Sequence, residues 1–443
     1  MNAIILSVGD ELVLGQTVDT NSAWLSQQLA RVGCEVSGHI TVPDSQQGIE
    51  QAIRHAASGC DVLLITGGIG PTADDLTRQS LAAVMNEPLE LNESWLAKLH
   101  DFFRARGRAM PALNRIQAMI PRGAEMIDNR CGTAAGIHAV LHRTTLLNRG
   151  IQAMSMHGEP RGEGGNTCDV FVMPGVPKEM KAMFERDVLP FVAKRSGGAV
   201  ILSRTLHTFG LGESAVAEML GGLMDRTRNP SVGTTVSAGI VSLRINSRFD
   251  TPARAQAELQ QTEALCRGAM GDLIYGADEQ TLPQVMTRML LSSSRPMELT
   301  TAESCTGGLL AKMLTDIPGS SAYFRQGWIT YANEAKTQML GVPADMIQRH
   351  GAVSQAVVGA MARGALDRTR ADFALAISGI AGPDGGTPEK PVGTVCIGLA
   401  SRSADCVTRT FSLLGDREMI RDRACKMALT MLRYHLLGKA MPF

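Results

Sequence analysis

Three side chains that could attack a carbonyl crowd one corner of the sequence, TAESCTGG at residues 301–308. Ser304, Cys305 and Thr306 follow a strand-like run and precede a glycine pair and the helical pattern LLAKML. Free amides at the start of a helix could stabilise an oxyanion, which makes Ser304 a candidate nucleophile. Cys305 would be stronger if activated, but its side chain should diverge from that of Ser304, and no histidine is near. The alternative is that Ser304 and Thr306 only cap the helix.

A serine nucleophile also needs a base. His350 falls in a loop and His435 in an apolar helix, where surface or packing roles are the simpler reading. Lys336 differs, because Asn333 is expected to cap the helix after the strand GWITY and would place Lys336 in its first turn. A cation there faces the positive end of the helix dipole, which favours loss of its proton. Lys336 is therefore the candidate base, and Tyr331 could position the pair or relay a proton.

A glycine-rich loop, TGGIGPTADDLT, follows the apolar run DVLLI in the first half of the chain. Gly67, Gly68 and Gly70 would let backbone amides approach an anionic group closely. Asp75 could accept from a hydroxyl or hold a cation, and Thr77 begins the next helix. A phosphate-bearing ligand would fit this loop. The alternative is that the glycines only make a tight turn and Asp75 caps the helix.

Apolar periodicity predicts the elements that position these loops. Across residues 1–194, strand-like runs alternate with helical patterns, which predicts α/β architecture with a parallel sheet and ligands beyond the carboxyl ends of its strands. Asn21 and Ser45 are the expected N-caps of the first two helices. The turn PGVPKEM, with Lys178 in the first turn of its helix, could close the same pocket as the glycine-rich loop.

Two further domains are expected. Residues 195–280 predict a small α+β module of helix, strands, helix and strand, and residues 281–443 alternate again, with Asp416 as the cap of the final helix. Gly268 to Gly271 have the G-x-x-G spacing of RNA-binding KH loops, yet the neutral chain lacks the charge that RNA binding requires. A structural connector is the favoured reading of the middle module.

Composition indicates a cytoplasmic protein. Lys plus Arg equals Asp plus Glu at 43 each, so no net field would attract nucleic acid or an anionic membrane. The 9 cysteines are odd in number, scattered and without a C-x-x-C pair, which disfavours a disulfide framework and a zinc cluster. The start, MNAIILSVGDEL, does not read as a signal peptide, and no run is apolar enough to span a membrane.

At these motifs the chain resembles the CinA (competence/damage-inducible) family over nearly its whole length. TAESCTGG, GWITYANEAK, HGAVS and SGIAGPDGG-x4-PVGTV are similar to the C-terminal CinA domain, and GDELVLGQTVDTNS, TGGIGPTADDLT and PGVPKEM to a molybdopterin-binding-type domain. The resemblance implies a parallel-sheet MoaB/MogA-like domain at 1–194, a KH-like connector at 195–280 and an α/β amidase domain at 281–443. An apparent insertion at about 143–167 departs from the family pattern and puts pocket closure or activity of the first domain in doubt.

For the C-terminal domain, the resemblance implies hydrolysis of nicotinamide mononucleotide to nicotinate mononucleotide and ammonia without a cofactor. It implies Ser304 as nucleophile, Lys336 as base and Tyr331 as a supporting group. The residues that would hold the amide and the ribose phosphate are Thr306, Gly307, Gly308, Ser378, Gly379, Gly382 and Arg417. Arg417 could instead be only a charge on a helix surface.

For the first domain, the resemblance implies either a pterin ligand or hydrolysis of the ADP-ribose pyrophosphate with a divalent metal such as Mg²⁺. Asp10 and Asp75 are the expected metal ligands, and Gly67, Gly68, Gly70, Thr77 and Lys178 the expected substrate contacts. Family members also imply a homodimer. The competing hypothesis is a non-catalytic scaffold that binds a nucleotide or molybdopterin.

Overall fold

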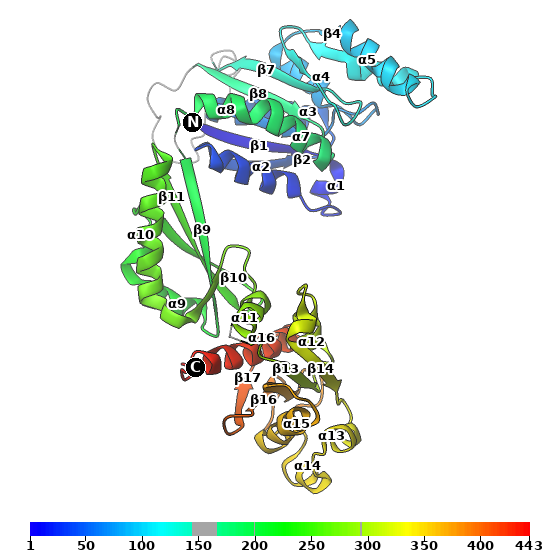
Figure 1. Ribbon diagram of the computed structural model, residues 1–443. Helices are drawn as coiled ribbons and strands as arrows, with labels where there is room; N and C mark the ends of the chain where they lie inside the picture. The colour runs from blue at the N-terminus through cyan, green and yellow to red at the C-terminus, as the bar shows by residue number, and fades with distance from the viewer. Residues whose placement is uncertain (144–165, 199, 293–294) are drawn as a thin grey trace. The chain divides into compact units, whose positions relative to one another are not determined.

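The computed structural model describes residues 1–143, 166–198, 200–292 and 295–443 (Figure 1). The chain forms two compact units: unit 1 is Met1–Leu202 with Ser247–Leu259, and unit 2 is Ser203–Asn246 with Gln260–Phe443. The multidomain α/β class predicted from the sequence is confirmed. The apparent insertion lies almost entirely outside the described residues. No helix in the described ranges is long and apolar enough to cross a membrane.

Unit 1 is built on a six-stranded sheet in the order β2-β1-β3-β8-β7-β6. Its strands are β1 Asn2–Val8, β2 Glu35–Val42, β3 Val62–Thr66, β6 Glu125–Ile127, β7 Gly136–His142 and β8 Thr167–Met173, and β4 Leu89–Leu91 pairs separately with β5 Met119–Pro121. Its helices are α1 Asp10–Val13, α2 Thr20–Arg31, α3 Gln46–Gly59, α4 Thr77–Met85, α5 Glu93–Arg104, α7 Pro177–Met183 and α8 Leu189–Arg195. The predicted parallel pairing holds for β2, β1, β3 and β8, whereas β7 and β6 are antiparallel.

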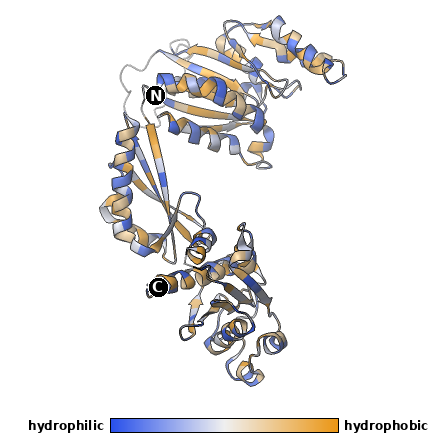
Figure 2. Ribbon diagram, in the orientation of Figure 1, coloured by the Kyte–Doolittle hydropathy of each residue, from blue (hydrophilic) through white to orange (hydrophobic). Residues whose placement is uncertain are grey.

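Alternate residues of the central strands fill two cores, one on each face of this sheet. Leu6 and Leu63 lie in the core that contains α3, while Ile5 and Leu64 lie in the core that contains α2. The strands therefore read as nearly continuous apolar runs, as expected when helices cover both faces of a sheet (Figure 2).

The predicted cap of α2 was wrong. Asp19 is the N-cap, and its carboxylate accepts from the Ser22 amide at 2.9 Å. Asn21 is already helical, and its amide donates to the Gly175 carbonyl at 2.8 Å. Asp19 also accepts from the Ser7 hydroxyl at 2.7 Å, so this cap ties α2 to the end of β1.

A four-stranded sheet, in the order β10-β11-β9-β12, follows in the chain. It comprises β9 Val200–Phe209, β10 Ser231–Ser237, β11 Ile240–Phe249 and β12 Ile274–Ala277, with α9 Glu213–Leu220 and α10 Pro252–Met270. The sequence reading missed β9, which precedes the first helix of this module. Gly268 ends up inside the last turn of α10, so the G-x-x-G spacing does not form a loop between two helices.

Unit 2 contains a five-stranded sheet in the order β14-β13-β15-β16-β17. Its strands are β13 Leu299–Glu303, β14 Phe324–Ile329, β15 Phe373–Gly379, β16 Thr394–Ser401 and β17 Val407–Ser412, and its helices are α11 Leu282–Leu291, α12 Leu309–Thr315, α13 Asn333–Leu340, α14 Ala344–His350, α15 Gln355–Arg368 and α16 Arg417–Leu436. β13 runs parallel to β14 and β15, so the carboxyl ends of these three strands share one edge. β16 and β17 are antiparallel.

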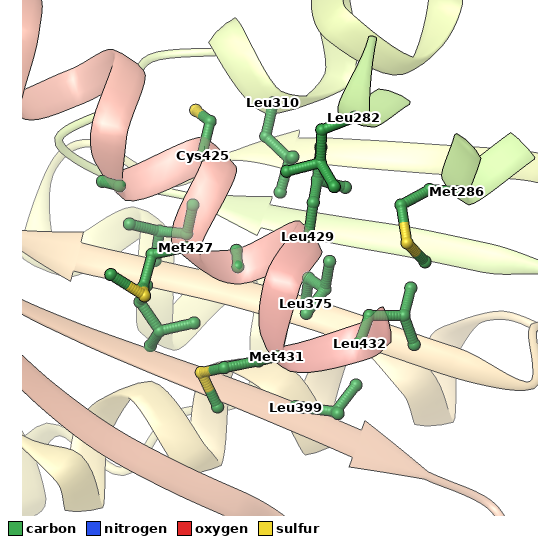
Figure 3. Close-up of a cluster of buried hydrophobic side chains, with 14 of the residues drawn as sticks. Leu282, Met286, Leu310, Leu375, Leu399, Cys425, Met427, Leu429, Met431 and Leu432 are labelled. Atoms are coloured by element: carbon green, nitrogen blue, oxygen red, sulfur yellow. The ribbon is translucent and has the colours of Figure 1, made fainter. Parts of the chain in front are cut away.

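Two helices cover the faces of this sheet. Figure 3 shows Leu429 and Leu432 of α16 among Leu310, Leu375 and Leu399. The opposite face presents mainly alanines to α15, including Ala374 and Ala376. Small side chains let this helix approach the sheet closely: a Cβ on Gly398 would come within 2.8 Å of the Val358 carbonyl oxygen. Asp416 caps α16 as predicted, by accepting from the Met419 amide.

Candidate active site

Ser304 lies directly after β13, at the shared edge of the parallel strands. Its amide donates to the Ile377 carbonyl at 2.9 Å, and its carbonyl accepts from the Gly307 amide at 3.1 Å. These bonds tie a tight turn, residues 304–308, to the neighbouring strand. Gly308 closes the turn with φ +93°, where a side chain would be strained and a Cβ would meet Ile329 at 2.9 Å. The Ser304 side chain is nearly buried, at 9% exposure.

The amine of Lys336 reaches the Ser304 hydroxyl. Lys336 Nζ lies 3.2 Å from Ser304 Oγ, 2.9 Å from the carbonyl oxygen of Thr330 and 3.2 Å from that of Tyr331. Lys336 stands in the first turn of α13, as predicted, but the N-cap of this helix is Ala332 and Asn333 is its first residue. The chain therefore brings both halves of the predicted pair into contact.

Burial lowers the pKa of Lys336 below its ordinary value of 10.5. The residue is 1% exposed, and the nearby Cys305 and Glu334 oppose this shift only in part. A lowered pKa was predicted from the sequence, but the predicted cause was the helix dipole. The main cause is instead the removal of the amine from water. A lysine with a lowered pKa is a better base near neutral pH.

The amides at the amino end of α12 are not free, contrary to expectation. The Glu303 carboxylate accepts from the amides of Gly308 and Leu310 at 3.0 Å each and from Ala311 at 2.8 Å. Neither Ser304 nor Thr306 caps the helix by its side chain. Thr306 is fully buried, and its hydroxyl has no hydrogen-bond partner among the described residues.

The Cys305 thiol is unsuited to nucleophilic attack. It is buried, and this burial raises its pKa to about 12, so the thiolate is scarce at neutral pH. The nearby Glu303 carboxylate adds to the same shift. Burial of the Cys305 thiol therefore favours Ser304 as the candidate nucleophile.

Arg417 is the first residue of α16 and links the Gly382 loop to Tyr331. Its guanidinium donates to the Gly382 carbonyl at 2.6 Å and to the Tyr331 hydroxyl at 3.1 Å. Tyr331 is 59% exposed, and in the described chain its phenol bonds neither Ser304 nor Lys336. Only its carbonyl contacts the lysine. The phenol of Tyr331 is therefore not placed to relay a proton between Ser304 and Lys336.

Gly382 belongs to the loop between β15 and β16, which closes on itself. The Ile380 amide donates to the Thr394 carbonyl at 2.9 Å, and the Gly393 amide to the Ile380 carbonyl at 2.8 Å. Ser378 precedes the loop, and its hydroxyl donates to the Ala352 carbonyl at 2.7 Å. Gly379 packs so closely against β16 that a Cβ would meet Val395 at 2.8 Å. The Ser378 hydroxyl is therefore already engaged, and Gly379 allows close packing between β15 and β16.

Sequence reasoning missed two residues here. Neither Glu303 nor Arg421, which donates to the Thr306 carbonyl at 2.7 Å, was among the predicted site residues. Arg421 follows Arg417 by one helical turn, a spacing that places both on one face of α16. The position of Glu303 at a strand end, before a glycine pair and a helix, was a signal for a side-chain cap.

In unit 1, the glycine-rich loop lies where the sequence predicted, after β3. Gly67 and Gly68 have φ of +97° and +65°, and Thr77 donates its hydroxyl to the Gly67 carbonyl at 2.9 Å. The Asp75 carboxylate accepts from the amides of Gly70 at 2.7 Å and Thr72 at 2.9 Å. Of the three glycine amides expected to meet a phosphate, Asp75 therefore occupies that of Gly70, while the Gly67 amide donates to the Met173 carbonyl at 3.1 Å. Asp75 caps the loop rather than α4.

Asp10 lies at the carboxyl end of β1 and is bonded to the next loop. Its carboxylate accepts from the Asp44 amide at 3.1 Å, and the Asp44 carboxylate accepts from the Asp10 amide at 3.0 Å. Burial raises the pKa of Asp44, and the carboxylates of Asp10, Glu11 and Asp74 add to the shift. This corner is therefore strongly negative.

The expected metal ligands do not assemble a complete site. Within the described ranges, no group of three or more His, Cys, Asp or Glu residues is arranged to hold a metal ion. Asp10 and Asp75 thus offer carboxylates near one sheet edge without a full ligand set. Lys178 lies exposed in the first turn of α7.

Comparison with known proteins covers the whole chain. Residues 4–194 match the model of a probable molybdopterin binding domain, 203–276 that of the damage-inducible protein CinA KH domain and 279–436 that of the CinA C-terminal domain. A putative competence-damage inducible protein of Symbiobacterium thermophilum is 44% identical over 99% of both chains. A CinA-like protein of Geobacter sulfurreducens is 39% identical over 99% of this chain and 100% of its own.

Among solved structures, the competence/damage inducible protein of Agrobacterium tumefaciens is 41% identical, with a TM-score of 0.34, and covers 36% of this chain and 97% of its own. The resemblance drawn from the sequence motifs is confirmed by the full-length relatives. This chain belongs to the CinA family of competence/damage-inducible proteins and combines a molybdopterin-binding-like domain, a KH-like connector and a CinA C-terminal domain.

Proposed function

We propose that unit 2 hydrolyses the carboxamide of nicotinamide mononucleotide to nicotinate mononucleotide and ammonia. The contact between Lys336 Nζ and Ser304 Oγ at 3.2 Å, in a nearly buried position, is the main support. A hydroxyl beside an amine of lowered pKa is a nucleophile with its base. The reaction needs no cofactor in this scheme.

The carbonyl groups around Lys336 favour the reactive form of the pair. A neutral amine has two N–H groups, which the carbonyl oxygens of Thr330 and Tyr331 accept. Its lone pair is then left for the hydrogen of the Ser304 hydroxyl. The two carbonyls thus orient the nitrogen as an acceptor toward the nucleophile.

The proposed reaction uses the Ser304 hydroxyl, the Lys336 amine and water. Ser304 Oγ attacks the carboxamide carbon while its proton moves to Lys336 Nζ. Lys336 returns the proton to the amide nitrogen as the C–N bond breaks, and ammonia leaves. Water, activated by the neutral lysine, hydrolyses the acyl-serine ester and releases the carboxylate product.

Arg417 would hold the substrate phosphate in this proposal. Its guanidinium is fixed by the Gly382 carbonyl and the Tyr331 hydroxyl, yet the side chain is exposed. An arginine held in this way can turn its free N–H groups toward a phosphate. Thr306, Gly307 and Gly308 line the turn where the amide would sit.

Ammonia release from nicotinamide mononucleotide tests the proposal. The wild-type chain, Ser304→Ala and Lys336→Met are compared after each variant has passed a thermal unfolding check. Turnover by the wild type and its loss in both variants is the expected result. Full activity in either variant, or no turnover by the wild type, would contradict the proposal.

For unit 1 we propose binding of a phosphate-bearing ligand, with ADP-ribose and its hydrolysis as the first case to test. Support comes from the glycine-rich loop and the acidic corner around Asp10 and Asp44 at the ends of parallel strands. ADP-ribose turnover is measured with Mg²⁺ and with a chelator, alongside Asp10→Asn. Tight binding without turnover under both conditions would favour the scaffold hypothesis instead.

A further inference from the structure

One buried carboxylate organises the turn that holds Ser304. Glu303, the last residue of β13, is 1% exposed and accepts three backbone hydrogen bonds from the start of α12. Its oxygens are therefore engaged, and it makes no ion pair with a lysine or arginine in the described chain. Such a carboxylate is stabilised by the amides and by the helix end it faces.

The remaining amides of the turn can be accounted for one by one. The Ser304 amide donates to Ile377, that of Gly307 donates to Ser304, and that of Gly308 donates to Glu303. Within the described chain, the amides of Cys305 and Thr306 alone in residues 304–308 make no hydrogen bond to another residue. They directly follow the nucleophile, where a developing oxyanion would need donors.

Arg421 of α16 also holds the same turn in place. Arg421 donates to the Thr306 carbonyl at 2.7 Å, and its guanidinium lies 3.4 Å from the place of a Cβ on Gly307. Glu303 thus holds the turn through amides on its helical side, and Arg421 holds it through a carbonyl. The conformation in which the Cys305 and Thr306 amides bond no other residue is thus fixed from both sides.

We propose that Glu303 is a positioning residue of the amidase site, which holds the 304–308 turn so that the Cys305 and Thr306 amides receive the oxyanion. This inference rests on the proposed role of Ser304 as nucleophile. Glu303 acts through the backbone and touches neither the substrate nor Lys336. Removing its charge should therefore lower the reactivity of Ser304 without changing the pH at which Lys336 loses its proton.

Glu303→Gln is the informative variant. The glutamine has the same size, but its single carbonyl oxygen can replace only one carboxylate oxygen, so its NH₂ group faces an N–H donor. Asp372→Asn is the control for loss of a carboxylate that holds the backbone, because Asp372 accepts from the Glu298 amide at 2.8 Å at the opposite end of β13 and β15 and also pairs with Arg295. Each variant removes a carboxylate that lies at an end of the same sheet and accepts hydrogen bonds from backbone amides.

The reactivity of Ser304 is read with a fluorophosphonate probe on the full chain, independently of any substrate. In this reaction Ser304 Oγ bonds to phosphorus, the P–F bond breaks, fluoride leaves, and the serine proton passes to Lys336. The rate of labelling is followed by mass spectrometry across a pH series, with Ser304→Ala as the specificity check. Measurements are made at a temperature where thermal unfolding shows every variant folded.

The expected result is an about 100-fold lower plateau rate for Glu303→Gln, the size of effect seen when an oxyanion donor is lost, with an unchanged pH midpoint. Asp372→Asn should label within about threefold of the wild type. A Glu303→Gln rate close to the wild-type rate, a shifted midpoint, or no labelling of wild-type Ser304 would overturn the inference. Ammonia release from nicotinamide mononucleotide is measured separately, so a wild type that labels but does not turn over this substrate refutes only the substrate assignment.

Discussion

Lys336 Nζ lies 3.2 Å from Ser304 Oγ although the two residues are 32 positions apart in the sequence. The parallel pairing of β13 with β14 makes this contact possible, because each side chain follows the carboxyl end of one strand of the pair.

Lys336→Met should abolish most of the amidase activity and leave the fold intact. Methionine fills the space of the lysine stem but cannot accept the serine proton, so kcat should fall by about 10²–10⁴-fold. Lys426→Met is the control, since Lys426 also donates to a carbonyl, that of Ala238, but does not contact Ser304. Equal losses in both variants would show that the effect is structural.

Amidase activity should rise with pH to a plateau. The neutral amine is the reactive form, and burial lowers the pKa of Lys336, so the midpoint should lie below the ordinary lysine value of 10.5. Measurement of kcat/KM across a pH series gives this midpoint directly. An activity that falls over the same range would contradict the role of Lys336 as a base.

The same shift predicts a change of stability with pH. Between the lowered pKa of native Lys336 and 10.5, the unfolded chain binds more protons at this residue than the native chain does. The contribution of Lys336 to the free energy of unfolding should therefore increase with pH in that window. Urea unfolding of the wild type and Lys336→Met at several pH values isolates this contribution, which should be absent from the variant.

Cys305 should resist alkylation and be dispensable for turnover. Burial raises the pKa of its thiol to about 12, whereas Cys131 is exposed. Iodoacetamide at pH 8 should modify Cys131 first, as peptide mass mapping would show. Cys305→Ala should keep turnover within about threefold of the wild type, and loss of activity with a normal fold would revive the thiol as nucleophile.

Arg417→Ala should weaken substrate binding more than it slows the chemistry. Loss of a charge-assisted contact to a phosphate costs about 1.5–3 kcal/mol, which is about 10- to 150-fold in KM. Nicotinamide riboside, which lacks the phosphate, should be affected far less. Arg423→Ala is the matched control on the same helix, because Arg423 bonds only the Leu414 carbonyl among the described residues.

Much of this architecture follows from periodicity, because buried strands and amphipathic helices require different spacings of apolar residues. Ser304 and Lys336 could be paired from sequence because each follows a strand of a predicted parallel sheet. The sequence position of Glu303 signals a side-chain cap, but the three amides that it bonds could not be named, since they come close to it only after the chain turns back into α12. Asp19 and Ala332 show the same limit for helix starts, where one residue either way changes the cap but not the pattern. The strand β9 was missed because its sequence lacks a clean alternation of apolar and polar residues.

The loop between β15 and β16 is closed by hydrogen bonds between its two ends. Its two ends are bonded to each other through Ile380, Gly393 and Thr394, so its interior can vary while the anchoring strands keep their register. The Gly382 end of this loop meets Arg417. Exchanging residues 381–392 should therefore leave the register of β15 and β16 unchanged, and its effect on the site should pass through the contact between Gly382 and Arg417.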